Sequence, residues 1–254
     1  MRVLAGLLLS LSVAALSPAQ TMLNAGSLAH FASGGGWSTT FFLFNTGAAA
    51  AQVQLNFYRD DGTAVVIPLD LPQLPGGGSS GAQFEYTLQP GTVLTVVTDS
   101  SDTTSTTGWA QLQASSSSVT GYLIFRYEGT SGSGVQEAVV TPETRNGTSY
   151  VIAFDNTDTH FTSYALANVT NQPVVVTATA RDALTGNVLG SSQTITLPAM
   201  GHHADQLSGL LPYTTSASGT VEFATPSAGQ ISVLGLRFSL PTDAFTSTPP
   251  ILKQ

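Results

Sequence analysis

Residues 107–127 read TGWAQLQASSSSVTGYLIFRY, and residues 218–238 read SGTVEFATPSAGQISVLGLRF. Each stretch has an alternating run, a short loop of small or polar residues, and a second alternating run that contains an arginine. The two stretches match at a single offset. Earlier landmarks repeat as well, since 38–45 resembles 161–168 and 53–60 resembles 174–182. The chain therefore consists of two similar halves.

Each half has the pattern of an all-β domain. Gln52–Phe57 alternates polar and apolar residues, which indicates a strand with one buried face. Val and Thr dominate 173–181, and both residue types favour strands. Turn signals such as Asp60-Asp61-Gly62 separate these runs. The sequence predicts two tandem Ig-like antiparallel β-sandwich domains, 20–142 and 143–254, after a signal peptide at 1–19. A single large barrel is the alternative, and the complete strand set in each half argues against it.

The N-terminus predicts export. Met1-Arg2 is a minimal positive region, 3–16 is mostly apolar, and Ser17-Pro18-Ala19 precedes a plausible cleavage point. The alternative is a membrane anchor, but the apolar run is shorter than the ~20 residues that a bilayer requires. We therefore expect no membrane span after signal cleavage. The mature protein is expected to be secreted or at the cell surface, in the extracellular space or the periplasm.

Composition narrows the class of partner. Only 9% of the 254 residues are charged, against about 25% in ordinary domains. The formal net charge is −8 and Lys253 is the only lysine, so the chain cannot neutralise nucleic-acid phosphates. Without cysteine it has neither disulfides nor thiolate metal sites. We expect no cofactor and no nucleic-acid partner.

The repeated stretch also predicts a candidate binding face. If Ala114 and Val119 flank a hairpin loop, Trp109 lies opposite Ile124 and Gln111 lies opposite Tyr122. The equivalent register in the second half sets Thr220 opposite Gly235 and Glu222 opposite Val233. One face of the first hairpin is then apolar. Its other face carries the candidate ligand-binding residues Trp109, Gln111, Tyr122 and Arg126.

Two interpretations of this face remain open. An aromatic and amide-rich flat sheet can bind polysaccharide by ring stacking and hydrogen bonding. Alternatively, a loop or the other domain covers Trp109 and Tyr122. Arg126 and Arg237 recur at matched positions, which favours a structural role for both arginines.

Catalytic and metal-site patterns are weak. Asp155 and Asp158, together with His160, form a weak calcium candidate that lacks the glycine and glutamate of an EF-hand loop. His202 and His203 would point to opposite faces of a strand. Nothing in the sequence places Glu137 and Glu143 across a cleft as a glycosidase requires. We expect neither catalytic residues nor a metal site, and the protein is predicted not to be an enzyme.

Four segments carry a family resemblance: 31–39, 108–110, 136–140 and 229–238. They resemble an uncharacterised family of exported bacterial proteins that occurs in soil-type bacteria such as acidobacteria, alone or appended to larger secreted proteins. The resemblance covers nearly all of the mature chain. It implies export and a tandem β-sandwich, and it supplies no active-site residues.

These observations favour a non-catalytic interaction, adhesion or assembly protein of the cell surface or extracellular matrix. A Ser/Thr-rich, weakly charged surface suits neutral partners: a protein, a second copy of the chain, or a polysaccharide. Exposed sheet edges without lysine favour self-association. The alternative function is a carbohydrate-binding module that uses the outer sheet face of the first domain.

Overall fold

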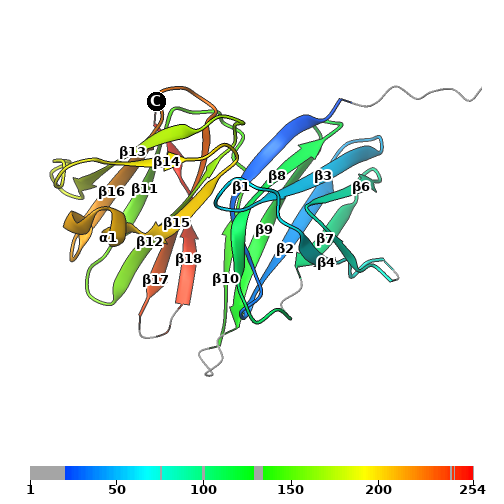
Figure 1. Ribbon diagram of the computed structural model, residues 1–254, viewed down its shortest axis with the longest axis horizontal. Coiled ribbons are helices and arrows are strands. Elements are labelled where there is room, and N and C mark those ends of the chain that lie inside the picture. Colours follow the sequence, from blue (N-terminus) through cyan, green and yellow to red (C-terminus); the bar gives the residue numbers. More distant parts are fainter. Residues whose placement is uncertain are drawn as a thin grey trace, which may run out of the picture.

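The computed structural model describes residues 21–74, 76–98, 101–128, 134–240, 242 and 244–253. The predicted signal peptide at 1–19 lies outside these residues. In Figure 1 the strands of the N-terminal half lie on the right and those of the C-terminal half on the left. No helix in the described part of the chain is long and apolar enough to cross a membrane.

The N-terminal half forms two antiparallel sheets. Sheet A has the strand order β1-β8-β3-β6, and sheet B has the order β10-β9-β2-β7-β4-β5. The strands are β1 Leu23–Ser33, β2 Trp37–Asn45, β3 Ala51–Tyr58, β4 Ile67–Asp70, β5 Ser79–Gly81, β6 Gln83–Leu88, β7 Val93–Thr98, β8 Thr106–Ala114, β9 Val119–Glu128 and β10 Val135–Val140. The apolar residues of these alternating strands enclose a core between the two sheets.

The C-terminal half forms two further sheets. Sheet C has the order β14-β13-β16-β11-β19, and sheet D has the order β15-β12-β17-β18. The elements are β11 Ser149–Asp155, β12 His160–Asn168, β13 Val174–Asp182, β14 Gln193–Leu197, β15 His202–Gln206, α1 Leu207–Leu210, the 3-10 turn Pro212–Thr214, β16 Ser218–Ala224, β17 Ile231–Ser239, β18 Ala244–Thr248 and β19 Ile251–Leu252. The all-β class is thus confirmed.

The expected arrangement as two tandem Ig-like β-sandwiches is wrong. The four sheets are arranged as a four-bladed β-propeller. These blades differ from the consecutive meanders of common propellers, because each sheet combines strands from distant parts of its half. The division into domains 20–142 and 143–254 remains a prediction.

Sheet D shows why the two halves are not independent sandwiches. Residues 231–236 of β17 are all buried, so both faces of this strand are covered. Ile231 and Val233 belong to the core of the C-terminal half. Leu234 and Leu236 instead join the core of the N-terminal half. Alternation of apolar residues predicts burial, but it does not specify which sheet lies against each face.

The predicted β8–β9 hairpin is also wrong. β8 pairs with β1 and β3 in sheet A, whereas β9 pairs with β2 and β10 in sheet B. Trp109 lies opposite Tyr58 rather than Ile124. The serine loop therefore connects one sheet to the next. The same holds for β16 and β17, which lie in sheets C and D, so Thr220 does not face Gly235.

The sequence repeat is real but is displaced by one residue in its second strand. Gly108 and Gly219 occupy equivalent places, since a Cβ at either would collide with the carbonyl oxygen of Tyr58 or of Arg181. In the next strand, Asn45 lies opposite Val119 and Asn168 lies opposite Ile231. The connecting loop is thus one residue longer in the C-terminal half.

This displacement removes the predicted match between the two arginines. Arg126 lies opposite Ser38, whereas Arg237 lies opposite Thr162. The asparagines that end β2 and β12 support this register, because Asn45 and Asn168 each donate to a carbonyl four residues later. Arg126 and Arg237 therefore have separate structural roles.

The contact between the halves is apolar at its centre. Phe245 of β18 stacks on Phe125 with the ring centroids 5.3 Å apart and the planes at 8°, and it also contacts Trp37. At the margin the Gln136 side chain donates to the Thr242 carbonyl over 3.1 Å. Such aromatic packing fixes the orientation of the halves.

Candidate functional site

The predicted candidate face is divided between two surfaces. Gln111 lies on the outer face of sheet A, and Tyr122 and Arg126 lie on the outer face of sheet B. The sheets enclose the core between them, so these outer faces point away from each other. Each surface is therefore described separately.

Trp109 is completely buried. Its ring stacks on Tyr58 with centroids 4.9 Å apart, and its Nε1 donates a 2.7 Å hydrogen bond to the carbonyl of Met200. The C-terminal half therefore covers Trp109, as the alternative interpretation expected for that residue. The indole is unavailable for stacking on a ligand. Burial also raises the pKa of Tyr58.

The outer face of sheet B carries a cluster of aromatic rings. The Tyr122 ring lies 5.1 Å from that of Phe42 and 5.7 Å from that of Phe44. All three side chains are partly exposed. Ile124 follows Tyr122 on the same face of β9 and is also partly exposed. We call Phe42, Phe44, Tyr122 and Ile124 the aromatic face.

The sequence interpretation found only part of this face. Phe42 and Phe44 were missed, although the run Phe41–Phe44 contains the signal, because in a strand every second residue of an apolar run points outward. Phe41 is buried and Phe42 is not. An outward-facing phenylalanine pair beside Tyr122 becomes visible only when β2 is known to adjoin β9.

Arg126 lies at the margin of the aromatic face and is paired with acidic side chains. Its guanidinium forms ion pairs with Glu128 and Glu137. These groups are substantially exposed, so the pairs stabilise the fold weakly. One guanidinium between two carboxylates compensates only part of their charge at this margin of the aromatic face.

The outer face of sheet A is rich in side-chain amides. In the register, Gln54 lies opposite Gln113 and Asn56 lies opposite Gln111, and Gln52 precedes them on β3. We call Gln52, Gln54, Asn56, Gln111 and Gln113 the amide face. Gln111 was predicted as a site residue; its neighbours on β3 were missed, because their proximity depends on the β3–β8 pairing.

The amides of the amide face differ in their hydrogen bonding: those of Gln54 and Asn56 are bonded within the chain, whereas others face solvent. Gln54 donates to Glu85 over 2.7 Å and accepts from Asn56 over 3.2 Å. Among the described residues, the side chains of Gln111 and Gln113 have no hydrogen-bond partner within the chain. Both are partly exposed, so their donors and acceptors face solvent.

The weak calcium candidate is occupied by groups of the chain itself. Arg237 donates to the Asp155 carboxylate over 2.9 Å, and the Thr157 hydroxyl donates to it over 2.6 Å. The Thr157 hydrogen bond, with Arg237, lowers the pKa of Asp155 to about 2. Asp155 and Asp158 belong to no group of three potential ligands in the described part of the chain. These hydrogen bonds hold the loop between β11 and β12 in place.

A series of polar side chains that the sequence interpretation missed, with two buried histidines and the exposed Asp60, joins the two halves. The Asp60 carboxylate lies 2.7 Å from His202 Nδ1, and His202 Nε2 lies 3.1 Å from His30 Nδ1. A carboxylate accepts, so neutral His202 carries its proton on Nδ1 and accepts from His30. The Asp60 carbonyl also accepts from the His202 backbone amide over 3.1 Å.

The surroundings of His30 favour its neutral form. His30 is buried, and its ring meets that of Phe125 edge-on. Burial, followed by the nearby His202, lowers the pKa of His30 to about 3. The hydrogen bond from His202 lowers the pKa of Asp60. A substrate cannot reach His30. The hydrogen-bonded series of Asp60, His202 and His30 therefore serves as a connection between the halves.

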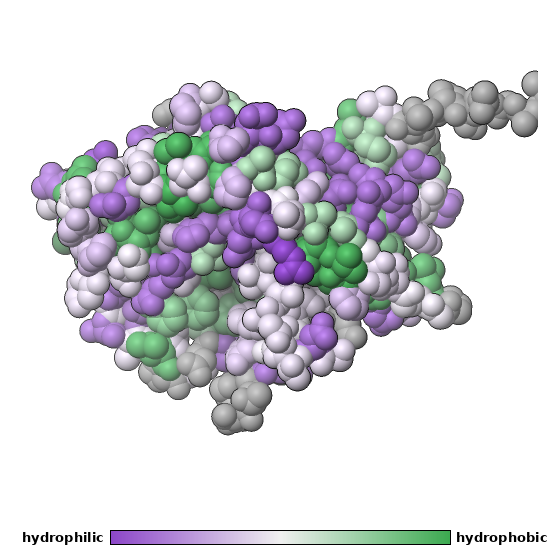
Figure 2. All heavy atoms as spheres, viewed as in Figure 1, coloured by the Kyte–Doolittle hydropathy of each residue, from purple (hydrophilic) through white to green (hydrophobic). Residues whose placement is uncertain are grey.

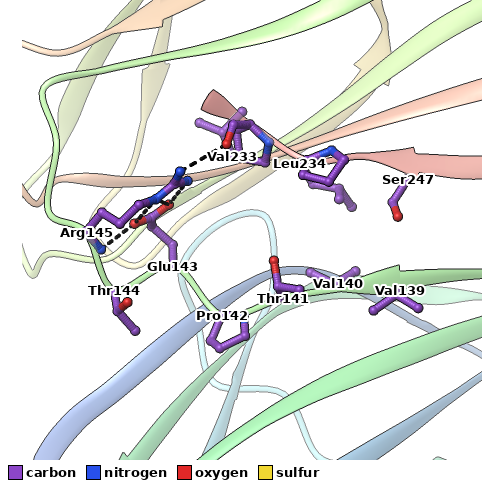
Figure 3. A pocket seen from close by; sticks show the side chains of 12 residues that line it. Val139, Val140, Thr141, Pro142, Glu143, Thr144, Arg145, Val233, Leu234 and Ser247 are labelled. Carbon is purple, nitrogen blue, oxygen red and sulfur yellow. Dashed lines mark hydrogen bonds and ion pairs between the residues drawn. The ribbon is translucent and has the colours of Figure 1, made fainter. Parts of the chain in front are cut away.

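A pocket of about 320 Å³ lies where the halves are linked (Figure 3). Val139 and Val140 line one side, and Val233 and Leu234 line another. At one end the Arg145 Nε donates to both oxygens of Glu143, at 3.1 and 3.2 Å. The two charged side chains that line the pocket, Arg145 and Glu143, therefore form an ion pair with each other.

A comparison of the chain with models of protein families finds no match, and neither does a comparison with curated proteins. The resemblance to exported bacterial proteins stays a prediction. Inferences about function consequently depend on the two faces and on the composition.

Proposed function

We propose that the protein is an exported, non-catalytic interaction protein that assembles with further copies of itself through the aromatic face. The observation that carries this proposal is the ring cluster of Phe42, Phe44 and Tyr122 on an outer sheet face. Export is inferred from residues 1–19, and the extracellular space or periplasm is the proposed location.

The chemistry of the aromatic face favours association over solvation. Aromatic side chains are enriched in the buried centres of protein interfaces, where charged residues are depleted. Next to the rings, Thr40 and Thr95 contribute hydroxyl groups, and Val139 adds an exposed apolar side chain. None of these groups is charged. A second copy offers the same uncharged surface in a two-fold arrangement.

The rest of the surface agrees with an uncharged partner. Figure 2 shows pale spheres, of near-neutral hydropathy, over much of the visible face. Some of the charges on strands pair locally, as Glu222 does with Lys253 at 2.7 Å. Association through such a surface should depend little on salt.

The test removes rings from the aromatic face while preserving strand propensity. In the double variant Phe44→Thr/Tyr122→Thr, both new residues favour strands. The matched control Val151→Thr/Val175→Thr alters two outward positions of sheet C. Light scattering should show a concentration-dependent mass for the wild type and the control, and a constant monomer mass for the ring variant. Equal association of all three proteins would reject the aromatic face as the contact surface.

A further inference from the structure

The amide face lies on a different sheet from the aromatic face and has a different chemistry. Its five amide side chains each combine a donor and an acceptor. Along a strand, outward residues recur every second position, and neighbouring strands lie about 4.8 Å apart. The backbone thus imposes a regular two-dimensional array of hydrogen-bonding groups on Gln52, Gln54, Asn56, Gln111 and Gln113.

This array is open to solvent where the amides are unpartnered. Gln111 and Gln113 have no hydrogen bond from their side chains within the described chain, and Gln52 is exposed. Glu85, the charged residue beside the array, accepts from the Gln54 and Gln83 side chains. Local amides therefore surround its charge.

At one end of the amide face lies the aromatic ring of Tyr58. Tyr58 follows Asn56 on the same side of β3 and is partly exposed. The Tyr58 ring stacks on the ring of Trp109. The Nε1 of Trp109 in turn donates to the Met200 carbonyl of the C-terminal half. An aromatic ring that is held rigidly at the end of a row of amides can contact the apolar face of a sugar ring.

We propose that the amide face binds a neutral, hydroxyl-rich polysaccharide. Sugar hydroxyls both donate and accept, as amides do, and they need no opposite charge. A protein partner fits poorly, because the array lacks the apolar centre of a protein interface. This inference is independent of self-assembly, which uses the opposite face of the N-terminal half.

The experiment is affinity electrophoresis of the mature protein in gels that contain hydroxyethylcellulose, dextran or galactomannan. The variant Gln111→Ala/Gln113→Ala removes the two unpartnered amides, and Gln52→Ala provides a second, exposed position. The matched control Gln172→Ala/Gln193→Ala removes two amides from the C-terminal half. At least one polysaccharide should retard the wild type and the control. Loss of two hydrogen bonds should weaken binding by about tenfold in the double variant.

The remaining outcomes overturn the proposal. Unretarded wild-type protein in all three gels would do so, and so would equal retardation of the double variant. A further outcome is a Gln111→Ala/Gln113→Ala protein whose light-scattering mass falls, which would assign the amide face to a second copy. The Phe44→Thr/Tyr122→Thr protein should still bind polysaccharide. The two proposals can therefore fail separately, and the variants show which one has failed.

Discussion

At the scale of single residues, the polar groups between the halves have the largest consequences. His30 is an enclosed histidine whose ring depends on His202, and His202 depends on Asp60. The sequence placed His202 on a strand but did not connect it with His30, because the two are 172 residues apart. Buried polar groups of this kind are costly when they lose their partners.

The first prediction concerns pH. The pKa of His30 is about 3 in the folded protein and about 6.5 in the unfolded chain. The unfolded state therefore binds more protons below pH 6.5, and the free energy of unfolding falls as the pH falls toward 3. Between pH 6.5 and 4.5 we expect a loss of about 2 kcal/mol. The carboxylates Asp60 and Asp155, whose pKa values are lowered, add their losses below about pH 4.

Chemical denaturation at pH 7.0, 5.5 and 4.5 measures this effect. The His30→Gln protein is the reference, because it cannot titrate at this position, and its stability should change less over the same range. Parallel pH profiles for the two proteins would show that His30 does not carry the dependence.

The second prediction concerns Trp109. Replacement with Phe keeps much of the stack on Tyr58 but leaves the Met200 carbonyl without its indole donor. We expect Trp109→Phe to lower the free energy of unfolding by about 1–3 kcal/mol. Unchanged stability would indicate that the hydrogen bond to the C-terminal half contributes nothing.

At the scale of elements, alternation in the sequence correctly predicted the burial of residues such as Leu112, Phe125 and Phe223, but Trp109 on the other face is buried as well. Alternation could not predict sheet membership, because the same alternation suits a hairpin and a connection between sheets. A one-residue difference in loop length also shifted the alignment of β17 relative to β9. Sheet membership and strand register both depend on pairing between strands that are distant in the sequence.

The third prediction compares the two repeat strands. Ile231 and Leu234 face different cores, so Ile231→Ala and Leu234→Ala should each cost about 2–5 kcal/mol. In β9 the outward Ile124 is only partly buried, and Ile124→Ala should cost about 1 kcal/mol. Denaturant unfolding of the three proteins tests this contrast. A small effect at Leu234 would be inconsistent with a core that continues from the N-terminal half into sheet D.

At the scale of the whole molecule, composition and export signals predicted an uncharged β surface, but they did not locate its contact areas. The candidate residues were expected on one surface, and the structure distributes them over two. Trp109 lies at the junction of the halves, Tyr122 belongs to the aromatic face, and Gln111 belongs to the amide face. The resulting account assigns protein contacts to one face and sugar contacts to the other.

The most direct test of self-assembly is the light-scattering mass of the mature protein, measured from low to high concentration in low and in high salt. The mass should rise with concentration and should be the same at both salt concentrations, because the aromatic face carries no charge. A monomer mass at every concentration would contradict the account, and so would an association that high salt abolishes.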